Sequence, residues 1–277
     1  MTASSNLNKS YETKNELEEI ICGEKCISEV RFKEIEKQAQ RSFHKFIING
    51  SKNSDLEGIT AVKYQIIGAN KINEIIDSVS GIWEEDYKEG LYKKQIIFYF
   101  NADKIYWELA KKSAGDNLFK IPVKKPEKVR EYILGSIKIC NEAIECAKNI
   151  SDKNYYIMGF YKRSYPKKAL YFLDINSDPR LILDSLNDSL EFLKFKDSLS
   201  PEVLAKNYAN LFYIVGVIKK QKIIEEDQLK NLIGSEIDCV KKAIKIFKEL
   251  GEESKAINLR KDLREFKKIL KERRSRA

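Results

Sequence analysis

The stretch AVKYQIIGANK, residues 61–71, decides the fold class of this chain. It lies in a segment from about 55 to 80 whose apolar residues recur every three or four positions, the spacing of one face of an α-helix. Gly68 is costly there, because glycine destabilises a helix by about 1 kcal/mol relative to alanine. Lys71 lies two turns beyond Tyr64 on the same face. The stretch predicts a helix and leaves open why it holds a glycine and what Lys71 faces.

Helical periodicity continues on both sides of this stretch. The chain has only 5 prolines and 12 glycines in 277 residues, which favours long helices over many short strands. Short connections predict that neighbouring helices pack antiparallel. We therefore expect an all-α fold, an array of about nine or ten antiparallel helices. Besides the segment above, the predicted helices cover about 12–22, 25–48, 89–113, 127–149, 152–174, 201–219, 225–250 and 252–273.

Several helix ends carry recognisable signals. Asp178-Pro179 and Ser200-Pro201 each combine an N-cap residue with a proline suited to the first helical turn. Gly251 stands where a C-cap glycine belongs. The lysine- and proline-rich stretch KIPVKKPEK, 120–128, predicts a linker. We nevertheless expect one domain over residues 1–277.

Composition and charge limit the classes of protein. The formal net charge is +9, but basic and acidic residues alternate along the predicted helices, as on an ordinary solvated surface. The first ten residues have no apolar signal core, and the longest apolar run, LFYIVGVI at 211–218, is far below the roughly 20 residues of a membrane span. Five cysteines without a CxxC pair predict reduced thiols, no metal site and a cytoplasmic, soluble protein.

The familiar enzyme motifs are missing from the sequence. The chain has one histidine, His44, and no GxxxxGK[ST], GxGxxG, HExxH or GxSxG stretch, so we expect neither an enzyme nor a cofactor. Two short basic stretches, YKRSYPKK at 161–168 and KERRSRA at 271–277, lack an accompanying nucleic-acid motif. A basic helical protein that binds nucleic acid is therefore a secondary hypothesis.

Five segments in order resemble one family, the 14-3-3 phosphoserine/phosphothreonine-binding adapters. AVKYQIIGA at 61–69 is similar to the family's third helix, which usually reads close to V-A-Y-K-N-V-V-G-A-R-R. The resemblance spans nearly the whole chain. Its other segments are KNEL at 14–17, IKICNEAIE at 137–145, NYANLFY at 207–213, and AIKIFKELGEESKA at 243–256 followed by LRKDLREFKKIL at 259–270.

The resemblance implies a nine-helix fold that dimerises through its N-terminal helices and binds phosphorylated segments of partner proteins in a groove. The family's phosphate pocket takes a lysine and an arginine, seven residues apart, from the third helix. A lysine, an arginine and a tyrosine come from the fifth. Residues seven apart share one helix face, so two helices can direct cations at one phosphate.

Carried over to this sequence, the pocket is partly altered. The third-helix lysine falls on Tyr64 and the arginine on Lys71. The fifth-helix lysine falls on Arg163, the arginine on Leu170 and the tyrosine on Tyr171. A nearby cation, Lys167, one turn past Arg163, is a candidate to refill the pocket. The groove asparagine that holds the peptide backbone matches Asn207 or Asn210.

Other departures from the family concern the insertion and the tail. Residues 82–128 are longer than the corresponding family stretch and predict one added helix. The family's tail is acidic, whereas residues 271–277 form a basic stretch that we expect to be flexible. Because the family also recognises phosphoserine near a carboxyl terminus, Ser275 is a candidate phosphorylation site that would occupy the groove.

The sequence leaves two alternatives to a phosphopeptide-binding adapter. Residues 243–256 have the character of a tetratricopeptide repeat, although no 34-residue period runs along the chain. A scaffold for unphosphorylated peptides is one alternative, and the basic nucleic-acid-binding protein is the other. The expected partners are phosphorylated proteins and a second copy of the chain, without a membrane or nucleic acid.

Overall fold

The computed structural model describes residues 31–48, 55–79, 85–115, 125–173, 178–224 and 236–274. Helices are the regular secondary structure of these ranges, and none of their residues lies in a strand. The prediction of an all-α helical array is confirmed. The IIFYF stretch within 96–100, strand-like in composition, is helical.

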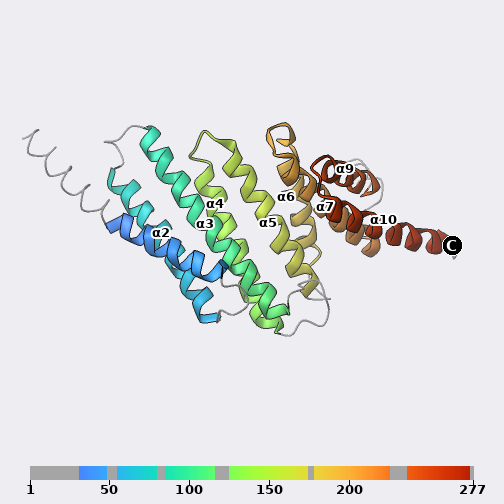
Figure 1. Ribbon diagram of the computed structural model, residues 1–277, viewed down its shortest axis with the longest axis horizontal. Helices are drawn as coiled ribbons and strands as arrows, with labels where there is room; N and C mark the ends of the chain where they lie inside the picture. The colour runs from blue at the N-terminus through green and yellow to red at the C-terminus, as the bar shows by residue number, and fades with distance from the viewer. Residues whose placement is uncertain are drawn as a thin grey trace, which may run out of the picture. The chain divides into compact units, whose positions relative to one another are not determined.

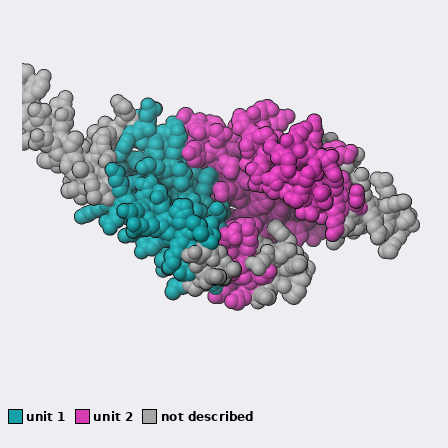
Figure 2. All heavy atoms as spheres, in the orientation of Figure 1, with its two compact units in different colours: residues 1–105 teal, residues 106–277 magenta. Residues whose placement is uncertain are grey.

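The chain divides into two compact units, Met1–Ile105 and Tyr106–Ala277 (Figure 2). The sequence predicts one domain, and we describe each unit by itself. The first unit holds a helix over residues 31–48, α2 (Asp55–Val79) and most of α3 (Glu85–Ala114). Helix α3, with 30 residues, fills much of the stretch predicted as an insertion.

Gly68 explains how α2 and α3 pack in the first unit. A Cβ atom added at Gly68 would approach the Phe98 ring of α3 to 2.8 Å, so the ring occupies the space that a larger side chain would need. Phe98 in turn packs edge-on against Phe32 of the 31–48 helix, with ring centroids 6.2 Å apart. Gln65, also on α2, donates a buried hydrogen bond to the carbonyl of Ala39 at 2.8 Å. The glycine is therefore retained for close packing.

The second unit is a series of helices, most of which pack on the next helix of the series (Figure 1). This arrangement follows from the short connections predicted from the sequence. Its elements are α4 (Pro126–Ala147), α5 (Lys153–Leu173), α6 (Arg180–Leu193), the short 3₁₀ helix η2 (Lys196–Ser198), α7 (Pro201–Gln221), α9 (Glu236–Glu249) and α10 (Glu253–Arg274).

The helix ends follow the expected local chemistry. Ser200 caps α7, its hydroxyl accepting a hydrogen bond from the Val203 backbone N–H at 3.4 Å. Gly251 has φ +73°, the left-handed conformation that a helix-ending glycine adopts easily. Helix α10 continues to Arg274, and the flexibility of the tail from residue 271 stays a prediction. Basic residues there suit the negative end of the helix dipole.

Several predictions concern parts of the chain outside the described residues. The predicted helix at 12–22 and the phosphorylation site at Ser275 lie wholly outside them. The predicted helices at 25–48 and 225–250 and the predicted linker at 120–128 lie partly outside them. Within the described ranges, no helix combines the length and the apolar composition that crossing a membrane requires.

Candidate anion-binding site

The candidate site consists of two cations on α5 and one carboxylate on α6. Arg163 and Lys167 are four residues apart and share a face of α5. Asp188 on α6 accepts two hydrogen bonds from the Arg163 guanidinium, from Nε at 3.0 Å and from Nη2 at 2.6 Å. The Lys167 ammonium lies 2.9 Å from the same carboxylate. We call Arg163, Lys167 and Asp188 the paired-cation site.

The carboxylate of this site is more deeply buried than the two cations. The Asp188 side chain is 4% exposed, whereas Arg163 and Lys167 are 18% and 13% exposed. A buried carboxylate is stable only when charged partners and hydrogen bonds compensate it, and both cations contribute here. The carboxylate thus holds the cations side by side near the surface, and the three groups together carry one net positive charge.

Arg163 and Lys167 both keep donor capacity. The remaining hydrogen bond of Arg163 runs from Nη1 to the side-chain oxygen of Asn141 on α4, at 2.7 Å. Within the described residues, three of the five guanidinium N–H groups are therefore engaged, and one of the three ammonium protons of Lys167. The guanidinium also lies 5.1 Å from the centre of the Phe160 ring. An anion that reached the unengaged N–H groups would not have to displace the contacts that orient the two cations.

Lys168, the next residue, faces a different part of the unit. Its side chain is buried and its ammonium donates to the Asn210 side-chain oxygen on α7. The ammonium also lies 5.1 Å from the Tyr165 ring centre and 5.5 Å from that of Tyr213. Burial lowers the pKa of Lys168 to about 7. Lys168 belongs to a buried polar core and not to the paired-cation site.

That polar core joins α5, α6 and α7. Asn210 donates to the Ser164 hydroxyl at 2.8 Å and to the Ser189 hydroxyl at 3.3 Å. The Ser164 hydroxyl is 2.7 Å from that of Ser189 and 3.1 Å from that of Ser185. Such a network fixes the relative register of three helices.

Three residues expected in the peptide groove are buried. Asn207 is 0% exposed and Asn210 is 2% exposed. The Asn207 amide donates to the Ser189 carbonyl at 3.1 Å, while its own oxygen has no hydrogen-bond partner among the described residues. Tyr171 packs in the core against α6 and α7, and its hydroxyl donates to Gln221. Asn207 and Asn210 therefore turn their amides toward polar groups of α5 and α6, and not toward the surface.

Tyr64 and Lys71 belong to the first unit. Lys71 is half-buried on α2 and pairs with Glu74, three residues further along the same helix. Tyr64 is half-buried on the same helix. The paired-cation site is built entirely within the second unit, by Arg163 and Lys167.

Asp188 and Asn141 complete the site but were not predicted from the sequence. The signal for Asp188 was present, because it falls among the residues of α6 that face the core. A carboxylate on a buried helix face requires a cationic partner. Asn141 gives no comparable signal, since an exposed asparagine on a helix is ordinary. The buried residues of α6 are Ile182, Ser185, Leu186, Asp188, Ser189 and Phe192.

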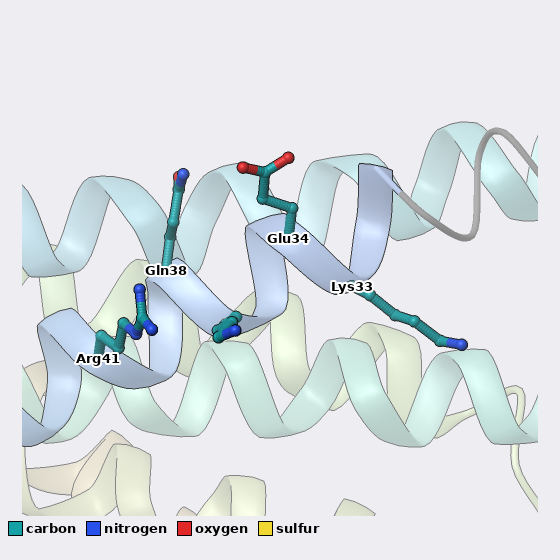
Figure 3. Close-up of a pocket in the computed structure, with 5 residues that line it drawn as sticks. Lys33, Glu34, Gln38 and Arg41 are labelled. Carbon is teal, nitrogen blue, oxygen red and sulfur yellow. The ribbon is translucent and has the colours of Figure 1, made fainter.

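A shallow pocket of about 370 Å³ lies on the 31–48 helix of the first unit (Figure 3). Its lining is polar and mostly cationic. Among the residues that the structure describes, no group of three or more His, Cys, Asp or Glu side chains is placed to hold a metal ion. The pocket is lined by Lys33, Glu34, Lys37, Gln38 and Arg41.

Comparisons with known proteins give only distant likenesses. No protein-family model matches the chain, and no curated protein matches it. Among solved structures it is similar to the de novo designed helical repeat protein DHR64, at 13% identity and a TM-score of 0.35, covering 90% of this chain and 99% of that one. It is also similar to the DHF58 filament, at 12% identity and a TM-score of 0.36, covering 90% and 98%. The DHF119 filament matches at 14% identity and a TM-score of 0.35, covering 78% and 97%.

Proposed function

We propose that the protein is an adapter that binds phosphorylated segments of partner proteins, with the phosphate received by Arg163 and Lys167. One observation carries the proposal. The buried Asp188 carboxylate holds two partly exposed cations side by side, and both keep unengaged N–H donors. A guanidinium and an ammonium in this arrangement suit the oxygens and the charge of a phosphate monoester.

The proposal differs from the sequence prediction in the residues of its pocket. The proposed pocket retains Arg163 and Lys167 and adds Asn141, which orients the guanidinium from α4. It does not include Tyr171, Asn207 or Asn210, because their side chains are buried. Lys71 and Tyr64 enter no part of the proposal.

The proposal includes a homodimer located in the cytoplasm. Cys140, Cys146 and Cys239 are all free thiols, which fits a reducing compartment. Dimerisation rests on the family resemblance, and the mass of the full chain by light scattering tests it separately.

Peptide binding to the full chain tests the function. In a fluorescence-anisotropy titration with a degenerate phosphoserine peptide pool, we expect Arg163→Gln to weaken binding by about ten- to a hundredfold, the loss of one charged hydrogen-bonding group. Lys167→Gln should weaken it in the same direction. The control is Lys148→Gln, which removes the same charge from an exposed lysine paired with Glu145 on α4.

The unphosphorylated pool separates the alternatives. Equal affinity for both pools would contradict the proposal and favour a scaffold for unmodified peptides. Binding of a single-stranded oligonucleotide with a steep salt dependence, unaffected by Arg163→Gln, would favour a nucleic-acid-binding protein.

A further inference from the structure

One face of the 31–48 helix carries three cations in a row. Lys33, Lys37 and Arg41 are spaced four residues apart and all three are exposed. Four residues advance a helix by about 6 Å and return to nearly the same face, so the three charges form a line about 12 Å long. We call these three residues the cationic face.

The three cations of the cationic face lie one helical turn from one another. No ion pair joins Lys33, Lys37 or Arg41 to a carboxylate within the described part of the chain, although Glu34 lies on the same helix. Several other lysines pair with a carboxylate one turn away, although exposed Lys63 and Lys138 also have no ion pair within the described residues. Like charges four residues apart on a helix repel one another. The lysine–carboxylate pairs include Lys71–Glu74, Lys93–Glu89, Lys111–Glu108, Lys148–Glu145, Lys194–Glu191 and Lys206–Glu202.

The shallow pocket of about 370 Å³ lies on this same face. Its other lining residues are Glu34 and Gln38, which project to one side of the helix, with Arg41 next to Gln38 (Figure 3). The face therefore offers three cations, one carboxylate and one amide to a ligand. A uniformly anionic ligand would meet repulsion at Glu34, whereas a mixed-charge ligand would not.

We infer that the cationic face is a docking surface for an acidic helix of a partner protein. Carboxylates four residues apart on such a helix repeat every 6 Å or so, which matches the spacing of Lys33, Lys37 and Arg41. A lysine on the same partner helix could pair with the Glu34 carboxylate. Nucleic acid fits less well, because its phosphates would face Glu34 and the lining holds no aromatic ring on which bases could stack. The inference is independent of the proposed phosphate site, which lies on other helices.

Titration of the full chain with labelled peptides of about 20 residues tests the docking surface. The first peptide is helical with glutamates four residues apart, and the second has the same composition with the glutamates spread around the helix. We expect the first to bind at least several-fold more tightly. The combined change Lys33→Gln, Lys37→Gln and Arg41→Gln should weaken its binding about tenfold, from the loss of three exposed ion pairs.

A second triple variant controls for net charge. Lys148→Gln, Lys194→Gln and Lys241→Gln remove three charges from exposed lysines that already have carboxylate partners, and they should leave binding of the first peptide unchanged. Equal losses in the two triple variants, or equal binding of the two peptides, would overturn the inference. A single-stranded oligonucleotide of the same charge that binds more tightly than the first peptide would also overturn it.

Discussion

At the scale of single residues, Lys168 is the group whose surroundings most change its chemistry. Burial lowers the pKa of its ammonium to about 7, from 10.5. Between these values the unfolded chain binds a proton that the folded chain does not. The free energy of unfolding that depends on Lys168 therefore increases as pH rises from about 7 to 10.5. Below pH 7 the lysine is protonated in both states, and its contribution is constant and at its most destabilising. A buried amine on α5 thus couples stability to pH.

We expect Lys168→Met to remove this pH dependence. The difference in unfolding free energy between wild type and variant should change by up to about 1.4 kcal/mol per pH unit above pH 7, and little below it. Chemical denaturation at about pH 6, 7.5 and 9 measures it. Lys148→Met, on an exposed lysine, should leave the wild-type profile intact. Parallel profiles for wild type and Lys168→Met would contradict the assignment.

Two glycines in the first unit have opposite expected effects. Gly68→Ala should destabilise by about 1 kcal/mol, since its Cβ would approach the buried Phe98 ring to 2.8 Å and the gain in helix propensity offsets only part of that overlap. Gly90 has no atom within 4 Å of an added Cβ, so Gly90→Ala should stabilise by about 0.5–1 kcal/mol. Thermal denaturation compares the two, and an increase in Tm for both variants would show that the ring yields easily.

The sequence holds only part of the information about the paired-cation site. Arg163 and Lys167 were identified as candidate ligands, but Asp188 was not, although it orients both. The resemblance to the family assigns roles to residues by their position in the aligned sequences. Such an alignment does not show that Asp188, 25 residues after Arg163 and on another helix, contacts it. From the aligned sequence alone, Asn207 and Asn210 are candidates for groove residues. Only packing of α5, α6 and α7 reveals that they lie inside.

At the scale of helices, the junction of α5 and α6 depends on one carboxylate. Asp188→Asn removes the negative charge but keeps the shape, leaving Arg163 and Lys167 with their mutual repulsion. Because all three side chains are mostly buried, we expect a loss of about 2 kcal/mol in the free energy of unfolding, measured by chemical denaturation at neutral pH. Asp178→Asn is the control. It changes an exposed carboxylate paired with Arg180 and should stay within about 0.5 kcal/mol of wild type.

Helix positions were largely predictable because their signals are local. Apolar spacing located α2, α4, α5 and α7 to within a few residues, and Ser200 caps α7 as expected. The Asp178 carboxylate accepts a hydrogen bond from the Arg180 backbone N–H at 2.9 Å, as a capping residue does, although α6 begins two residues later. The division into two compact units depends on contacts between helices, which periodicity does not encode.

At the scale of the whole molecule, the second unit has a simple pattern of neighbours. Helix α4 packs on α5, α5 on α6, α6 on α7, α7 on α9 and α9 on α10. Contacts between segments close in sequence require little loop-closure entropy, so this unit belongs to the class of topologies that fold fast. Stability in such an array is close to a sum of terms between adjacent helices. A sequence change at one interface is therefore felt mainly there, and the paired-cation site between α5 and α6 can diverge while α9 and α10 keep their own packing.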